Sequence, residues 1–108
     1  MFKIIVFVPE THKEAVKEAI FLAGAGMIGL YDRCSFETVG TGQFRPRPGS
    51  NPFLGSELEV EKVLEYRVEI VCERSKIKEV ILKMRQAHPY EEPAFDVIAL
   101  EHDLMNYR

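Results

Sequence analysis

A glycine- and proline-rich segment in the middle of the chain limits the possible folds more than any other feature. Residues 40–55 contain four of the seven glycines and three of the six prolines in this 108-residue sequence. No helix can run through them, because proline removes a backbone donor and glycine is a poor helix former. We therefore predict a projecting hairpin or long loop at about residues 40–56, which divides the chain into two halves.

Each half has the order strand, helix, strand. Apolar runs and strict alternation of apolar and polar residues predict strands, whereas apolar residues three and four apart predict amphipathic helices. The predicted elements occupy residues 2–8, 15–23, 30–39, 64–73, 77–87 and 94–100. Thr11 with Glu14 has the pattern of a capping box for the first helix, and Ser75 is expected to cap the second.

This order predicts an α+β fold, a ferredoxin-like βαββαβ sandwich with a four-stranded antiparallel sheet and two helices on one face. The first and third strands should lie in the centre, and residues 1–108 should form a single domain. The uncovered face would carry apolar residues such as Ile5, Phe7, Val71 and Ile98. Burial of that face or its edges would stabilise self-association, so a homo-oligomer is expected.

Charge and composition exclude several classes of partner. A net charge of −3 with interspersed signs gives no electrostatic footprint for nucleic acid or for an anionic membrane. The sequence has no long apolar run, and its short apolar start is interpreted as a strand and not as a leader peptide. Cys34 and Cys72 lie within apolar alternation, which favours reduced, buried thiols and a cytoplasmic location.

The connection after the second helix concentrates polar chemistry. Pro89 ends the helix, and the neighbouring side chains His88, Tyr90, Glu91 and Glu92 supply an imidazole, a phenol and two carboxylates. An imidazole with carboxylates suits a divalent metal, and the cluster also suits a small ligand or a partner. The alternative is a helix stop with solvated carboxylates, since adjacent carboxylates on an extended backbone point apart.

The glycine-rich segment has two interpretations as well. Gly40 and Gly42 suit a backbone cradle for an anion, but the prolines that follow forbid the helix that a phosphate loop requires. A turn or bulge is the alternative. Phe44, Arg45 and Arg47 suit contact with an anion or a partner, or they keep the loop solvated.

Two long motifs carry a resemblance to a known family. They are Gly40-x-Gly42-x-Phe44-x-Pro46-x-x-Gly49-x-x-Pro52-x-x-Gly55 and His88-Pro89-Tyr90-Glu91-Glu92-Pro93-Ala94-Phe95-Asp96-Val97. Together they resemble the signature of the inserted domain of the NIF-three-like family, the YqfO group. The resemblance implies a CutA- and PII-like fold that commonly forms oligomers, with the glycine-rich segment in the position of the long signalling loop of PII proteins.

The resemblance also limits what can be transferred. Full-length members of the family are two-part proteins in which this domain interrupts a larger one with a dinuclear metal site. The chain has only His12, His88 and His102 and no clustered histidine motif. We therefore expect a stand-alone inserted domain without that metal site, and we do not carry over a hydrolase or cyclohydrolase activity.

We predict a non-enzymatic, oligomeric binding or regulatory module with no cofactor and no catalytic residues. Its partner is expected to be a small molecule or a protein. The predicted ligand-binding residues are Gly40, Gly42, Phe44, Arg45, His88, Tyr90, Glu91 and Glu92. The alternatives are a metal-binding protein or metal-dependent enzyme with a site around His88, Glu91 and Glu92, and an interaction domain whose loop docks on another protein.

Overall fold

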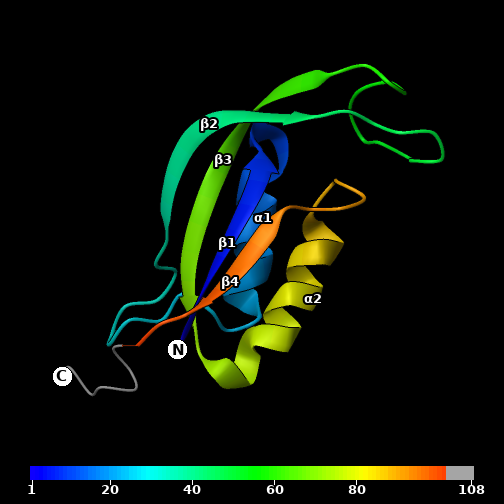
Figure 1. The fold of residues 1–108 in the computed structure, drawn as a ribbon. Coiled ribbons are helices and arrows are strands. Elements are labelled where there is room, and N and C mark those ends of the chain that lie inside the picture. Colours follow the sequence, from blue (N-terminus) through cyan, green and yellow to red (C-terminus); the bar gives the residue numbers. More distant parts are fainter. Residues whose placement is uncertain (102–108) are drawn as a thin grey trace.

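Two strand–helix–strand units build one antiparallel sheet in the computed structural model, which describes residues 1–101 and leaves His102 and the residues after it outside. The sheet order is β2-β3-β1-β4, and α1 and α2 lie together on one of its faces (Figure 1). The elements are β1 (Phe2–Pro9), α1 (Lys13–Leu22), β2 (Phe36–Phe44), β3 (Glu61–Cys72), α2 (Ile77–Ala87) and β4 (Phe95–Ala99). This confirms the predicted α+β sandwich with β1 and β3 in the centre.

The alternation of the two central strands places the core. Every second residue of β1 and β3 points toward the helices, because successive side chains of a strand face opposite sides of the sheet. These residues meet the apolar stripes of α1 and α2. The buried cluster consists of Ile4, Val6, Val8, Val68, Ile70 and Cys72 from the strands, Val16, Ile20, Val80 and Met84 from the helices, and Ala25.

The second strand lies further along the chain than predicted. β2 spans Phe36–Phe44 and pairs with residues Glu61 to Glu69 of β3. Upstream, Ile28 and Tyr31 exchange backbone hydrogen bonds of 2.9 and 3.0 Å, and Arg33 has a φ of 54°, so this part of the chain turns instead of extending. Gly40 to Phe44 therefore belong to the sheet, and the connection between β2 and β3 covers residues 45–60 instead of about 40–56.

Neither predicted helix cap is used. Each helix is preceded by one turn of 3₁₀-helix, at Glu10–His12 and Arg74–Lys76, which takes up the residues expected to act as caps. The Thr11 hydroxyl instead lies 2.9 Å from Nδ1 of its neighbour His12, and Ser75 sits inside the second 3₁₀ turn.

Charged side chains cover part of the sheet face that carries no helix, although Phe36 and Ile98 on this face are 65% and 47% exposed. Ile5 lies on this face but is only 2% exposed. Its same-face neighbours Lys3 and Glu69 form an ion pair at 3.4 Å, and the Arg67 guanidinium lies 6.0 Å from the centre of the Phe7 ring. The long side chains of this chain thus shield part of the apolar surface that was expected to need a partner.

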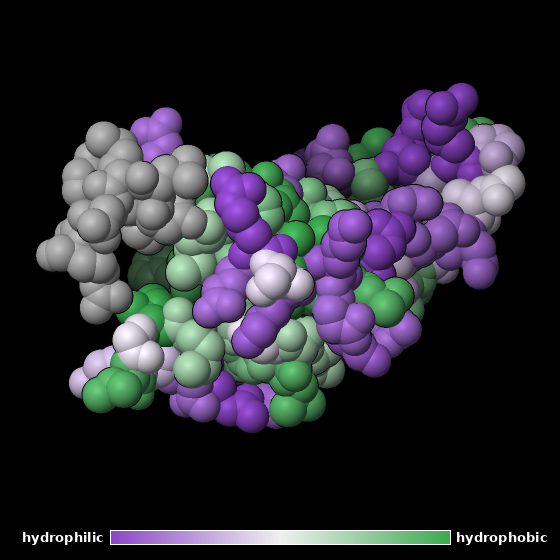
Figure 2. All heavy atoms as spheres, turned by 90° about the horizontal axis from the view of Figure 1, so that it is seen from below, coloured by the Kyte–Doolittle hydropathy of each residue, from purple (hydrophilic) through white to green (hydrophobic). Residues whose placement is uncertain are grey.

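The end of the molecule that carries residues 45–60 projects beyond the helices, close to the connection between α2 and β4 (Figure 1). Seen from below, that end is largely hydrophilic, at the right of Figure 2. Within residues 1–101, no helix is long and apolar enough to cross a membrane.

Candidate functional site

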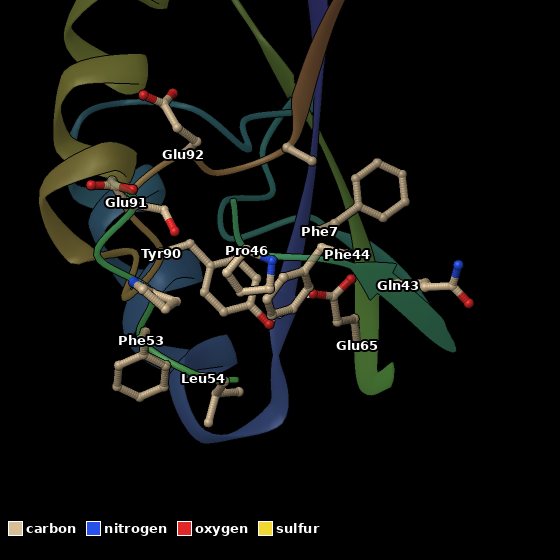
Figure 3. Close-up of a pocket in the computed structure, with 13 residues that line it drawn as sticks. Phe7, Gln43, Phe44, Pro46, Phe53, Leu54, Glu65, Tyr90, Glu91 and Glu92 are labelled. Atoms are coloured by element: carbon tan, nitrogen blue, oxygen red, sulfur yellow. Dashed lines mark hydrogen bonds between the residues drawn. The ribbon is translucent and has the colours of Figure 1, made fainter. Parts of the chain in front are cut away.

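A cavity of about 270 Å³ lies between the projecting residues 45–60 and the connection 88–94. These two segments are about 40 residues apart in sequence, and a hydrogen bond of 3.2 Å from the Asn51 amide to the Glu91 carboxylate joins them. Figure 3 shows the side chains around the cavity. The lining residues are Phe7, Gln43, Phe44, Pro46, Ser50, Pro52, Phe53, Leu54, Glu65, Tyr90, Glu91, Glu92 and Ala94.

Tyr90 is the centre of an aromatic cluster that holds the walls of the cavity together. The centre of its ring lies 6.0 Å from that of Phe44 and 6.4 Å from that of Phe53, which come from β2 and from the projecting segment. The His88 ring is 4.9 Å away on the side of α2. Such ring pairs contribute about 0.5–1.5 kcal/mol each beyond burial, so the cluster stabilises the approach of the two segments.

A carboxylate from the central strand β3 enters this cluster. The Tyr90 hydroxyl donates a hydrogen bond of 2.8 Å to Glu65, and burial together with this bond raises the pKa of Tyr90 well above its usual value. A Cβ atom at Gly42 would overlap the Glu65 carboxylate. Gly42 therefore leaves room for a carboxylate beside β2, which is the opposite of the anion cradle considered from the sequence.

His88 is buried and has a structural role. Its Nε2–H donates to the Phe7 carbonyl at 2.8 Å, and its Nδ1 accepts from the Tyr90 amide at 3.1 Å. We assign this tautomer because Nδ1 faces a backbone N–H and Nε2 faces a carbonyl. The pKa of His88 lies below its ordinary value, mainly because the ring is buried. Neither ring nitrogen is left to bind a metal ion.

The remaining predicted site residues divide into two groups. Phe44, Tyr90, Glu91 and Glu92 line the cavity, whereas Arg45 does not, and Gly40 lies with Gly42 in a shallow groove beside it. Glu91 and Glu92 have different partners, since Glu92 lies 3.7 Å from Arg85 of α2. No group of three potential metal ligands occurs in the part of the chain that the structure describes. The geometry thus gives no support to the alternative of a metal site around His88, Glu91 and Glu92.

Sequence reasoning missed several lining residues. In the sequence, Glu65 looks like an ordinary solvent-facing residue of an alternating strand. Only the pairing of β2 with β3 shows that it lies opposite Gly40. Phe53 gave one usable signal, since it is the one aromatic residue in the connection 45–60 and lies there beside Leu54. Phe7 was noted from the sequence as an uncovered residue of the sheet and not as part of a site.

No family model matches the chain. The chain is 51% identical over 98 residues to the GTP cyclohydrolase 1 type 2 homolog of Mycobacterium tuberculosis, and 43% identical over 103 residues to the protein of that name from Halalkalibacterium halodurans. These alignments cover 91% and 95% of the chain but 26% and 28% of the relatives. The chain thus spans about a quarter of the length of these curated relatives.

Solved structures give the same correspondence. A Bacillus cereus protein related to NIF3 matches with a TM-score of 0.80 and 44% identity, over 93% of this chain and 25% of the other. The CutA protein of Archaeoglobus fulgidus matches with a TM-score of 0.66 and 17% identity, over 94% of this chain and 85% of the other. At that identity the likeness shows the fold alone, and it confirms the predicted CutA-like architecture.

The buried imidazole generates a prediction for stability against pH. The folded-state pKa of His88 lies below its ordinary value of about 6.5, so the unfolded chain binds this proton more readily. The contribution of neutral His88 is present above about pH 6.5 and is lost as the pH falls through the folded-state pKa. We expect the free energy of unfolding, measured with urea from pH 7.5 to about pH 5, to fall more steeply for the wild type than for His88→Gln.

The same variant should be less stable than the wild type at pH 7.5, by about 1–3 kcal/mol, because a buried backbone group loses its partner. Circular dichroism would verify that the variant folds. Parallel curves of unfolding free energy against pH for the two proteins would contradict the assigned role of His88.

Proposed function

We propose that this chain, a homologue of one segment of the NIF3-related proteins, is a non-enzymatic, oligomeric binding or regulatory module. Its ligand site would be the cavity between residues 45–60 and 88–94. The observation that carries the proposal is the cavity itself, since about 270 Å³ of space, partly open to solvent, lies between the sheet and two segments that meet only in the folded chain. Concave sites with mostly apolar walls and a few polar groups are typical of small-molecule binding.

A binding role fits the chemistry of the walls better than a catalytic one. The one serine hydroxyl in the lining, that of Ser50, already donates to the Arg47 carbonyl at 2.7 Å. The Tyr90 hydroxyl already donates to Glu65 at 2.8 Å. The nearest imidazole, that of His88, has both nitrogens bonded to backbone groups. Burial raises the pKa of the Cys72 thiol, which favours its unreactive protonated form.

Self-association is the second part of the proposal. β2 is a nine-residue strand at the edge of the sheet, and a long exposed edge readily pairs with another chain. Phe36 and Val39 on this strand are 65% and 61% exposed. We therefore place the contact between copies along β2. We further propose that the chain is one domain and that it works in the cytoplasm, in keeping with its free cysteines.

Filling the cavity should abolish ligand binding. In a thermal-shift screen of nucleotides and central metabolites, a compound at 100 times its Kd stabilises the folded state by about 2.7 kcal/mol. For a domain of this size, that corresponds to a rise in Tm of about 10 °C. We expect Ala94→Phe to remove this shift, because Ala94 lies in the lining and a phenyl group would occupy the space.

Ala99→Phe is the matched control, since Ala99 is an exposed alanine at the other end of β4, the strand that follows Ala94, and does not line the cavity. It should keep the shift. A ligand whose Tm shift survived in Ala94→Phe would bind elsewhere and would refute this location for the site.

The assembly prediction is tested by the molar mass in solution. Light scattering after size exclusion should give a mass above that of one chain, and Phe36→Lys with Val39→Lys should reduce it, because like charges would meet along β2. Leu82→Lys, at a 48% exposed position of α2, serves as the control and should leave the mass unchanged. A monomeric wild type at micromolar concentration would remove the oligomer from the proposal.

A further inference from the structure

We propose that the cavity binds a small organic cation, in which an ammonium group is carried on a compact apolar body. This inference rests on the proposed function, because it names the class of ligand for the same cavity. It depends on three properties of the described residues: the charge of the lining, the arrangement of the aromatic rings and the size of the space.

The charge of the lining has one sign. It includes three carboxylates, those of Glu65, Glu91 and Glu92, and no lysine, arginine or histidine. An anionic ligand such as a nucleotide would meet carboxylates on its approach and would find no basic side chain to pair with. A cation would gain attraction from the same groups, and most from Glu65, because Glu65 is half-buried whereas Glu91 and Glu92 are exposed.

Two of these carboxylates lack the basic partner that others have. Glu37 binds Lys13 and Lys17, Glu69 pairs with Lys3, and Glu92 pairs with Arg85. By contrast, Glu65 accepts a hydrogen bond from the Tyr90 hydroxyl and Glu91 accepts one from the Asn51 amide. Within residues 1–101, neither forms an ion pair, so a cation in the cavity would be their counter-charge.

The aromatic rings supply the rest of the recognition. The rings of Phe44, Phe53 and Tyr90 line the same space (Figure 3). The centre of the Tyr90 ring lies 6.0 Å from that of Phe44 and 6.4 Å from that of Phe53. The planes of these two pairs are inclined by 55° and 47°, so the rings are tilted instead of stacked flat. Ring faces carry negative potential and attract ammonium groups within about 6 Å. The Tyr90 hydroxyl donates to a carboxylate, which makes its ring more electron-rich.

The size of the space and the chemistry of its walls favour an organic cation over a metal ion. A cavity of about 150 Å³ is enough for benzene in another protein, so about 270 Å³ accommodates a somewhat larger molecule. Hard metal ions need several oxygen ligands around one point, and no such group occurs in the described part of the chain. Phenyl rings and prolines in the lining instead match methyl and methylene groups.

The test uses three probes of nearly the same shape and different charge. Choline is the cation, 3,3-dimethylbutan-1-ol is its neutral carbon analogue, and 3,3-dimethylbutanoate is the anion. Calorimetric titration of the full chain should show choline binding about tenfold or more tighter than the neutral analogue, with the anion weakest, as a desolvated cation–π contact implies.

Variants connect this preference to the cavity. Glu65→Gln keeps the shape of the side chain and an acceptor for Tyr90 but removes the charge. The affinity for choline should therefore fall by about tenfold, while the affinity for the neutral analogue should not change. Phe53→Leu, in the projecting segment, should also lower the affinity for choline more than the affinity for the neutral analogue. Glu73→Gln removes the charge of an exposed carboxylate directly after β3, outside the lining of the cavity, and should change neither affinity.

The outcomes separate this inference from the proposed function. If the neutral or anionic probe binds as well as choline, and Ala94→Phe blocks it, the cation preference is refuted while the cavity remains a ligand site. If no probe binds at millimolar concentration, the choline-sized cation is refuted, and the metabolite screen decides the proposed function independently. Choline binding that Glu65→Gln and Phe53→Leu leave intact would also refute the inference.

Discussion

The two hydrogen bonds of the His88 ring determine how the cavity is built. Nε2–H fixes the end of α2 to the Phe7 carbonyl of the central strand, and Nδ1 fixes the Tyr90 amide two residues later. Tyr90 then reaches Glu65 on β3 and packs against Phe44 and Phe53. A single buried imidazole thus sets the position of the side chain on which both walls of the cavity depend.

Much of the fold could be predicted from the sequence, because strand and helix periodicities are strong and local. The alternation from Leu64 to Cys72 and the apolar run of β1 gave the two central strands and most of the core. The position of β2 could not be predicted, since Gly40 and Gly42 look like loop residues until their pairing with β3 is known. The 3₁₀ turns before both helices gave no distinct signal either.

The sequence predicted where the candidate site lies but not what each of its residues does. The sequence singled out Phe44, Tyr90, Glu91 and Glu92, and the structure brings them around one cavity. It also singled out His88, whose burial depends on contacts with β1, 81 residues away, that no local pattern reveals. Glu65 was missed because a carboxylate on a strand usually faces solvent, and only the tertiary structure places a tyrosine hydroxyl beside it.

A map of amide chemical shifts during titration with a cavity ligand tests the central claim most directly. The claim is that the projecting residues 45–60 and the connection 88–94 act together as one binding site. The largest changes should occur at the amides of Phe44, Asn51, Phe53, Tyr90 and Glu91, from both segments at the same ligand concentration. Changes confined to one segment, or centred on the opposite end of the sheet near Ile28 and Tyr31, would contradict it.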